Sequence, residues 1–162
     1  ELLQHSDHRG FFSRFFCAEA FKEQGLAHNM VQCNISRCNY RGTLRGLHYQ
    51  TAPALESKFI RCTRGEICDV LVDMRPDSPT YLKHYTIKLS ADSNQAMYIP
   101  GMCAHGYQAL TDDTEVMYLT SAPYNGDYEK GLRYDDPRIG IQLPIPVTEI
   151  SGKDKCWPDV TP

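Results

Sequence analysis

Residues 58–74 read KFIRCTRGEICDVLVDM and contain two apolar segments joined by the turn sequence TRGE. From Cys68 to Met74 every second residue is apolar, and Asp69 and Asp73 occupy alternate positions. Successive side chains of a β-strand point to opposite faces, so this pattern predicts a strand with one apolar face. A short turn that contains a glycine separates the two segments. The stretch therefore predicts two strands joined by a turn.

Comparable short runs of alternating apolar and polar residues lie on both sides of this stretch. They comprise FFSRFF (11–16), MVQCNIS (30–36), RGTLRGLHYQ (41–50), HYTIKLS (84–90), QAMYIP (95–100) and TEVMYLT (114–120). Turn-forming residues separate the runs at intervals typical of a β-sandwich or barrel. We therefore predict an all-β fold, built as a single antiparallel barrel.

Two regions depart from the strand pattern. Residues 18–26, AEAFKEQGL, place Phe21 and Leu26 on one side and Gly25 near the end, which predicts a short N-terminal helix. After residue 125 the chain is rich in Pro, Gly and Asp, and we expect this irregular C-terminal segment to wrap the sheet without extending it. Domains cluster around about 100 to 150 residues, so we expect residues 1–162 to form one domain.

Composition and charge argue against several classes of partner. The net charge is −3, Lys and Arg form no continuous stripe, and no uncharged stretch is long enough for a membrane helix. These features disfavour nucleic acid and membranes as partners, whereas a small anionic ligand needs only a few converging cations. The seven cysteines form no C-x-x-C pair, which predicts reduced thiols and a cytoplasmic location. Because the chain begins ELLQ without methionine, we expect N-terminal residues to be missing.

Two histidines lie in strand segments that contain glycine. His48 belongs to RGTLRGLHYQ and His105 to PGMCAHGYQ, and each is compatible with a metal ligand, a catalytic base or a packed ring. Inward-facing residues of several strands line the mouth of a small barrel, where one ligand can bind. On strict alternation Arg45 and His48 point to opposite faces. A bulge at Gly46 would place both side chains on the same face.

Lys58 and Asp69 are further polar residues within predicted strands. Lys58 shares a face with Ile60 and Cys62, so it is either an inward-facing isolated ammonium or an exposed lysine at the start of a strand. Asp69 either faces inward and orients a histidine or lies in solvent. The residues alone leave both pairs of alternatives open.

The motifs also occur in a recognisable order. RGTLRGLHYQ, the segment from Lys58 through SPTY, AHGYQ, TEVMYLTSAPY and ISGKDKCWP together resemble the dTDP-4-dehydrorhamnose 3,5-epimerase family, from DHRGFF at residue 7 almost to the end. The resemblance implies a cupin-like jelly roll, which is a double-stranded β-helix. It further implies an isomerase that inverts stereocentres beside the C4 ketone of a nucleotide-linked 4-keto-6-deoxyhexose, without a metal or redox cofactor. It implies a homodimer in which N-terminal residues cross to the partner.

The resemblance implies roles for individual residues as well. The implied catalytic residues are His48 as general base, Asp154 as its partner, Tyr118 as the acid on the opposite face, and Lys58 near the developing enolate oxygen. The implied substrate-binding residues are Arg9, Gln32, Asn34, Arg45, His105, Tyr124, Glu129 and Lys153. Within this set His105 lies near the enolate oxygen, Tyr124 stacks on the base, and Arg9 would serve the pocket of the neighbouring subunit.

These roles fit the chemistry of a proton beside a ketone. Such a proton is weakly acidic, and its removal places negative charge on the carbonyl oxygen, so a fixed cation such as Lys58 lowers the barrier. A neutral histidine accepts a proton near physiological pH, and a carboxylate behind it fixes the tautomer. Inversion also requires a donor on the other face, because return of the proton from the base restores the starting configuration.

Other functions use similar residues. Many cupins bind a metal through an H-x-H pair, a glutamate and a later histidine, but here the first motif is His48-Tyr49-Gln50 and only His48 and His105 remain of that set. That is fewer than the three protein ligands of most catalytic zinc sites, so we expect no metal. A 3-epimerase that acts at one carbon, a 3,4-ketoisomerase, and a non-catalytic cupin that binds a sugar nucleotide are the alternatives.

Overall fold

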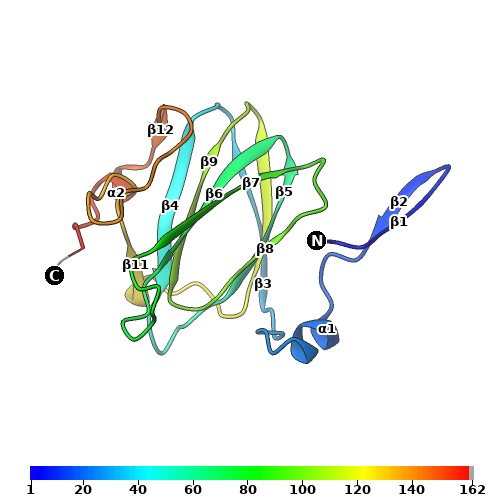
Figure 1. Ribbon diagram of the computed structural model, residues 1–162, viewed down its shortest axis with the longest axis horizontal. Coiled ribbons are helices and arrows are strands. Elements are labelled where there is room, and N and C mark those ends of the chain that lie inside the picture. Colours follow the sequence, from blue (N-terminus) through cyan, green and yellow to red (C-terminus); the bar gives the residue numbers. More distant parts are fainter. Residues whose placement is uncertain (161–162) are drawn as a thin grey trace.

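The computed structural model describes residues 1–160, which form mostly strands with a few short helices (Figure 1). The elements in chain order are β1 (Gln4–Asp7), β2 (Gly10–Ser13), α1 (Ala18–Glu23), β3 (Gln32–Cys38), β4 (Thr43–Gln50), β5 (Lys58–Arg64), β6 (Glu66–Asp73), β7 (His84–Ser90), β8 (Met97–Ile99), β9 (Cys103–Ala109), β10 (Thr114–Thr120), the 3-10 helix η1 (Gly126–Tyr128), β11 (Glu129–Gly131), β12 (Glu149–Ile150) and α2 (Gly152–Lys155). The predicted all-β class and the short N-terminal helix are confirmed.

Two sheets form the body of the molecule. The smaller sheet has the strand order β3-β10-β5-β8, and the larger has the order β11-β4-β9-β6-β7. Pairing within both sheets is antiparallel, except that β12 runs parallel to β4. The chain passes between the sheets, so that neighbouring strands within a sheet are distant in sequence except for β6 and β7, as in a jelly roll. The candidate site lies at the inner face of these sheets.

Strand β6 explains how the core is divided. Both of its faces are buried, because Ile67 packs in a cluster with residues of both sheets, whereas Val70 and Val72 pack in a second cluster. The second cluster contains Leu132 and Ile139 of the C-terminal segment. The larger sheet is therefore covered on one face by the smaller sheet and on the other by the C-terminal segment, which anchors that segment to the body.

The C-terminal segment does more than wrap the sheet, and the prediction that it would not extend the sheet is wrong. Strand β11 pairs with β4 in the register Glu129↔Gln50 and Gly131↔His48, and β12 pairs with the start of β4. The segment also forms α2, which the sequence did not lead us to expect. The backbone N–H and C=O groups of β4 form hydrogen bonds with this segment, so it pairs with the sheet despite its irregular composition.

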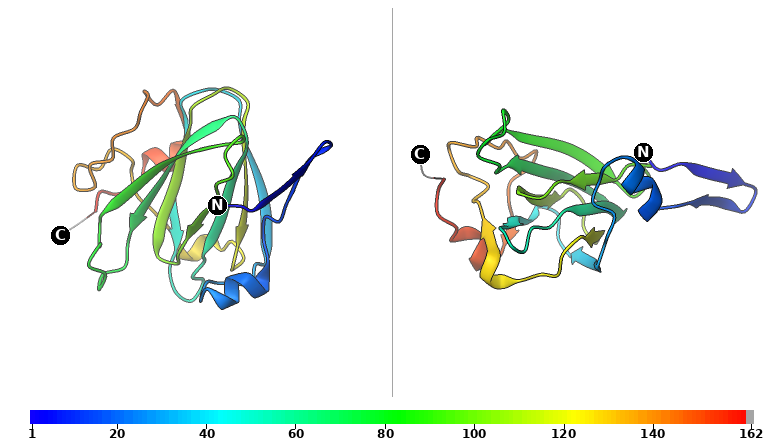
Figure 2. Two further views of the ribbon diagram at one scale, coloured as in Figure 1. Left: turned by 45° about the vertical axis from the view of Figure 1, so that its right-hand side comes forward. Right: turned by 90° about the horizontal axis from the view of Figure 1, so that it is seen from below.

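The N-terminal residues form a hairpin that projects from the body (Figures 1 and 2). The predicted single strand over residues 11–16 is wrong in part, since β2 ends at Ser13. Phe15 leaves the hairpin and stacks on Phe59, with ring centroids 4.7 Å apart, and Phe21 of α1 packs edge-on against the same ring. Aromatic packing against the body therefore overrides the alternating pattern at this point.

Two further properties concern the whole described chain. All seven cysteines are free thiols, as expected from their spacing. In the part of the chain that the structure describes, no helix has the length and apolar character needed to cross a bilayer.

Candidate active site

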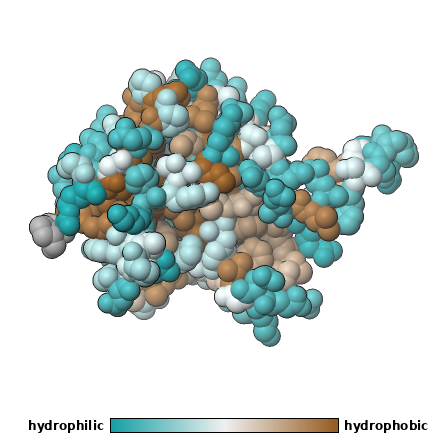
Figure 3. All heavy atoms as spheres, in the orientation of Figure 1, coloured by the Kyte–Doolittle hydropathy of each residue, from teal (hydrophilic) through white to brown (hydrophobic). Residues whose placement is uncertain are grey.

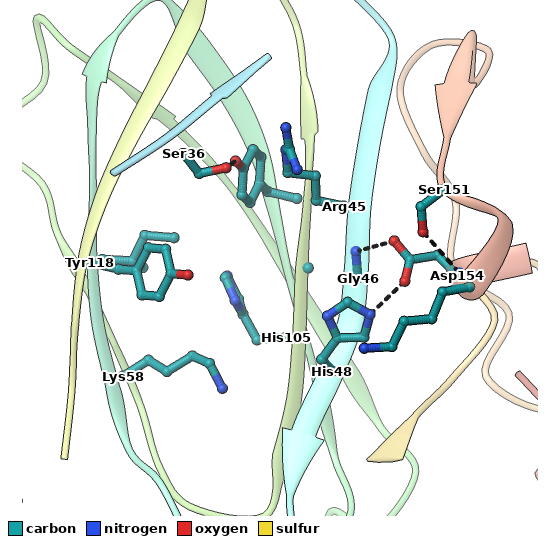
Figure 4. A pocket seen from close by; sticks show the side chains of 13 residues that line it. Ser36, Arg45, Gly46, His48, Lys58, His105, Tyr118, Ser151 and Asp154 are labelled. Carbon is teal, nitrogen blue, oxygen red and sulfur yellow. Dashed lines mark hydrogen bonds and ion pairs between the residues drawn. The ribbon is translucent and has the colours of Figure 1, made fainter. Parts of the chain in front are cut away.

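A cavity of about 300 Å³ lies between the two sheets, and side chains from both sheets point into it (Figure 4). It is lined by Ser36, Arg45, Gly46, His48, Lys58, Ile60, His105, Gly106, Tyr107, Tyr118, Ser151, Lys153 and Asp154. A second cavity of about 320 Å³ shares His48, Lys58 and Tyr118 with the first. The two cavities are therefore adjacent and together make up the candidate site, and each is in the size range of small-molecule pockets.

A histidine–carboxylate pair occupies one wall. Nε2 of His48 lies 2.5 Å from Oδ1 of Asp154, and Oδ2 of Asp154 accepts from the Gly46 N–H at 3.3 Å. Burial alone raises the pKa of Asp154, but its hydrogen bond and charge interaction with His48, and the Gly46 N–H, bring the pKa below its ordinary value. The ionised Asp154 therefore holds Nε2–H of His48 and leaves Nδ1 free toward the cavity (Figure 4).

A β-bulge brings Arg45 and His48 to the same cavity, which decides the question that strand alternation left open. Arg45 pairs with Tyr107 and His48 with His105, so two residues of β4 lie opposite the single residue Gly106 of β9. Gly46 has φ of +102°, and a Cβ on Gly46 would lie 2.6 Å from the carbonyl oxygen of His105. Glycine is therefore required here both for its backbone conformation and for the close approach of β9.

The second histidine has its own buried carboxylate. Nε2 of His105 lies 2.7 Å from Oδ1 of Asp69, and the Asp69 side chain has an exposed fraction of 0%. Asp69 therefore faces inward and orients a histidine, which decides between the two alternatives left by the sequence. His105 lies beside His48 in the strand register, so the two imidazoles reach the cavity from neighbouring strands.

Lys58 also faces the cavity, but it is not an isolated ammonium. Its Nζ forms an ion pair with Glu56, and the two side chains have exposed fractions of only 12% and 9%. Neither alternative left by the sequence is right: Lys58 faces inward, and because burial of a charge requires a partner, the loop before β5 supplies Glu56. Lys58 carries three N–H donors, so donors remain for a ligand in the cavity.

Tyr118 of β10 reaches the cavity from the smaller sheet, across from His48 (Figure 4). Burial raises the pKa of Tyr118, the negative charge of Glu56 adds to the increase, and Arg45 opposes it. The phenol is therefore held in its protonated form at physiological pH and can donate a proton. His48 and Tyr118 thus supply an acceptor and a donor on opposite sides of one cavity.

The second cavity carries a polar cluster around Glu129. Oε2 of Glu129 accepts from Tyr124 Oη at 2.8 Å and from the ammonium of Lys153, while Oε1 lies 3.8 Å from Nδ1 of His48. Burial raises the pKa of Glu129, but the hydrogen bonds from Lys153 and Tyr124 lower it below its ordinary value. The N–H of Tyr124 also donates to Gln32 at 2.9 Å.

Most of the sequence-predicted site residues therefore meet at the two cavities. Asn34 lines the second cavity with Gln32, and Lys153 lines the first. Arg9 is the exception, since its side chain is 78% exposed on the projecting hairpin, where it pairs with Asp7. Within residues 1–160, no group of three or more His, Cys, Asp or Glu side chains is arranged to hold a metal ion.

Sequence reasoning missed three residues of the site. Ser151 caps α2 by accepting from the Asp154 N–H at 3.0 Å, and the spacing in SGKD is a helix-start pattern that could have revealed α2. Glu56 lies in a loop, where alternation carries no information. The ring of Trp157 packs edge-on to His48 with centroids 6.1 Å apart and lies against Gly131, contacts that only the fold brings about.

Comparison with known proteins agrees with this architecture. The family model described as dTDP-4-dehydrorhamnose 3,5-epimerase matches residues 1–161. A dTDP-4-dehydrorhamnose 3,5-epimerase of Sinorhizobium fredii is 40% identical over 155 residues, which cover 95% of this chain and 80% of that protein.

Solved structures are similar over almost the whole chain. The Bacillus anthracis dTDP-4-dehydrorhamnose 3,5-epimerase with TDP and PPi bound has a TM-score of 0.95 at 35% identity, covering 99% of this chain and 91% of that one. A 3'-monoepimerase of Streptomyces bikiniensis in complex with dTDP-quinovose has a TM-score of 0.89 at 32% identity, covering 98% and 80%. The chain therefore belongs to the dTDP-4-dehydrorhamnose 3,5-epimerase family of isomerases, which have a cupin-like jelly-roll fold.

Proposed function

We propose that the protein epimerises a nucleotide-linked 4-keto-6-deoxyhexose at C3, at C5 or at both, in deoxysugar biosynthesis. One observation carries the proposal: a carboxylate-held histidine and a protonated tyrosine face each other across one cavity, with a lysine and a second histidine between them (Figure 4). Inversion of a stereocentre beside a ketone needs this set, which comprises a base, an acid on the opposite face and a cationic group for the oxygen.

The proposed reaction begins with proton removal. Nδ1 of His48 takes the proton from the carbon beside the C4 ketone, and the electron pair of the C–H bond moves onto the carbonyl oxygen to give an enolate. Lys58 stabilises the negative charge on that oxygen by donating a hydrogen bond. His105 contributes as the imidazolium, with Nε2–H on Asp69 and Nδ1–H donated to the oxygen. The ionised Asp154 stabilises the imidazolium that forms on His48.

The second half of the reaction returns a proton to the opposite face. The enolate collapses to the ketone as the carbon takes a proton from the Tyr118 hydroxyl, which inverts the centre. Tyr118 recovers its proton from solvent, and His48 releases its proton to solvent. No net oxidation or reduction occurs, so the cycle balances without a co-reactant.

The remaining predicted residues would bind the nucleotide part of the substrate. Arg45 would contact the sugar nucleotide, and Tyr124 would stack on the base. The other proposed contacts come from Gln32, Asn34 and Glu129 of the second cavity and from Lys153 of the first. The matched Bacillus anthracis structure with TDP and PPi supports a nucleotide-diphosphate ligand.

Solvent exchange tests the proposal. The protein is incubated with dTDP-4-keto-6-deoxyglucose in deuterated water, and the exchanged positions are located by NMR. We expect deuterium at C3 and C5 of the sugar, because each inversion replaces a carbon-bound proton with one derived from solvent. If neither this sugar nor its analogues with other nucleotides exchange a proton, the protein is a binding cupin and the proposal fails.

The same experiment separates one inversion from two. The similarity to a 3'-monoepimerase supports a second candidate, a 3-epimerase that leaves C5 unchanged. Deuterium at C3 alone would support that candidate. A 3,4-ketoisomerase would instead move the carbonyl group, which the carbon chemical shifts would reveal.

We further propose a homodimer in which the hairpin crosses to the partner and Arg9 serves the partner's pocket. Phe11 and Phe12 of the hairpin are 60% and 63% exposed, and Figure 3 shows hydrophobic surface on this projecting arm. A flat apolar edge of this kind needs to be covered. We likewise infer a single domain, since the family model spans residues 1–161, and a cytoplasmic location, which the free cysteines support.

A further inference from the structure

A fourth carboxylate of the site, Glu56, has no role in the reaction described above. It lies in the loop before β5, its side chain is only 9% exposed, and it lines the second cavity together with Lys58 and Tyr118. Asp154 and Asp69 each hold a histidine, whereas the carboxylate of Glu56 is in an ion pair with Lys58. Removing the charges of Glu56 and Lys58 from water lowers the free energy of unfolding, and their mutual attraction does not always offset this cost. The buried pair therefore calls for an explanation.

We propose that Glu56 is a positioning residue, whose carboxylate holds the Lys58 ammonium in place and whose negative charge, in the cavity that Tyr118 also lines, disfavours the tyrosinate. This inference deepens the proposed function and rests on it. The lysine side chain is a flexible stem of four carbons, and an ion pair at its end fixes Nζ within the cavity. Because Nζ has three N–H groups, it can keep Glu56 and still donate to a substrate oxygen.

The effect on Tyr118 follows from the charges around the phenol. Lys58 approaches from β5, His48 and Arg45 from β4, and His105 from β9. All four are cationic or become cationic on protonation, so each favours the tyrosinate. Asp154, Asp69 and Glu129 are the other negative groups of the site, and they pair with His48, His105 and Lys153. Glu56 lines the second cavity with Tyr118, and its charge adds to the effect of burial in raising the pKa of Tyr118.

The Glu56→Gln variant tests the proposal, because glutamine keeps the shape and a hydrogen-bond acceptor but removes the charge. Tyr118 is titrated by the ultraviolet absorbance of tyrosinate, taken as the difference between each protein and the same protein carrying Tyr118→Phe. We expect Tyr118 to titrate at lower pH in Glu56→Gln than in the wild type. We also expect kcat to fall roughly tenfold, with KM changed less than about twofold. The alkaline limb of the pH profile of kcat should move to lower pH.

Two further variants complete the experiment. Glu115→Gln removes a carboxylate from the same strand as Tyr118, but Glu115 lies on the other face and accepts from Thr63 at 2.9 Å, so no change is expected. Glu56→Asp retains the charge, and it should titrate closer to the wild type than Glu56→Gln does. It also keeps the question decidable if the glutamine variant folds poorly.

The outcomes separate this inference from the proposed function. An unchanged Tyr118 titration in Glu56→Gln would overturn the inference, as would a raised KM with unchanged kcat, which would make Glu56 a substrate ligand. If the wild-type protein exchanged no proton with any 4-keto sugar nucleotide, the proposed function would fail. The absorbance titration would still decide whether Glu56 controls Tyr118.

Discussion

At the scale of single residues, the site consists of ionisable groups that each have a carboxylate partner. Asp154 holds His48, Asp69 holds His105, and Glu56 pairs with Lys58. In each pair the partner fixes one end of the side chain and leaves the other end available to a ligand. Prior orientation of this kind lowers the cost of reaching the transition state, because little reorganisation remains.

Replacement of His48 tests its role as the base. His48→Asn keeps a polar side chain of similar size but removes the group that accepts the proton, so we expect kcat to fall by about 10²- to 10⁴-fold. Turnover and solvent exchange are both measured by NMR. His84→Asn serves as the control, since Nδ1 of His84 donates to the Ile139 carbonyl oxygen and His84 lines neither cavity, so kcat should stay unchanged. Retention of full activity by His48→Asn would contradict the assignment.

Asp154 gives a pH-dependent prediction about stability. Its pKa in the folded protein is below its ordinary value, so the ionised form stabilises the fold at pH above about 3.9, and this contribution is lost as the pH falls through the lowered value. Asp154→Asn should therefore lower the free energy of unfolding by roughly 1 to 3 kcal/mol at neutral pH. The difference from the wild type should shrink in acid.

Thermal unfolding followed by circular dichroism across this pH range measures the difference. Asp77→Asn, at an exposed loop position, controls for the loss of one negative charge. A difference between Asp154→Asn and wild type that stayed constant into strong acid would show that the carboxylate charge is not what stabilises the fold.

How much of the site could be predicted depended on where each residue lies. The residues carried by quoted motifs, such as His48, Lys58 and Tyr118, do line the cavity. Whether Lys58 or Asp69 faced inward could not be decided from alternation, because both faces of the central strands are buried. Glu56 was missed because a loop has no periodicity, and its proximity to Lys58 depends on the path of the chain.

At the scale of elements, the bulge in β4 is what turns a strand into part of a site. The glycines of β4 and β9 lie against each other, since a Cβ on Gly106 would lie 2.5 Å from the carbonyl oxygen of Arg45. This close approach closes the wall between the two histidines. The bulge was predictable from Gly46 between two polar residues that had to share a face.

Gly46→Ala should disrupt that wall. The added methyl group would meet the β9 backbone, and φ of +102° disfavours any residue with a Cβ, so we expect a loss of roughly 2 kcal/mol or more in stability and a larger loss of kcat. Denaturant unfolding and turnover measure the two effects. At Gly101 a Cβ would meet its nearest neighbour, the carbonyl oxygen of Glu56, at 3.6 Å, so Gly101→Ala should be tolerated. Equal behaviour of the two variants would refute this account.

Elements of the C-terminal segment were the least predictable part of the fold. Strands β11 and β12 have three and two residues, which is too short for alternation to be recognised. They exist because β4 offers unpaired backbone groups on that side, a tertiary property that no local sequence pattern carries. The consequence for the site is large, since this segment delivers Asp154, Glu129 and Lys153.

At the scale of the whole molecule, the smaller sheet presents an apolar outer surface at its edge. Ile35 of β3 is 70% exposed, and its register neighbour on β10 is Met117. We expect this face to take part in the proposed homodimer, because a large exposed apolar side chain on an edge strand invites pairing.

Ile35→Glu should therefore shift the protein from dimer toward monomer, because a charge cannot be buried at an apolar interface without a partner. Light scattering coupled to gel filtration measures the molar mass. Tyr85→Glu provides a matched control, since Tyr85 is 56% exposed on β7, the edge strand of the other sheet. A wild-type protein that is monomeric, or a dimer indifferent to Ile35→Glu, would count against this interface.

The position of Trp157 has a practical consequence for studying this protein. The chain has a single tryptophan, and its indole packs against the ring of the proposed base and within 5.7 Å of the Lys153 ammonium. Indole emission depends on its surroundings, and an imidazolium quenches it more strongly than a neutral imidazole does. All tryptophan fluorescence of the unlabelled protein thus comes from Trp157, beside the site. Protonation of His48 and binding of a ligand can therefore be followed by fluorescence.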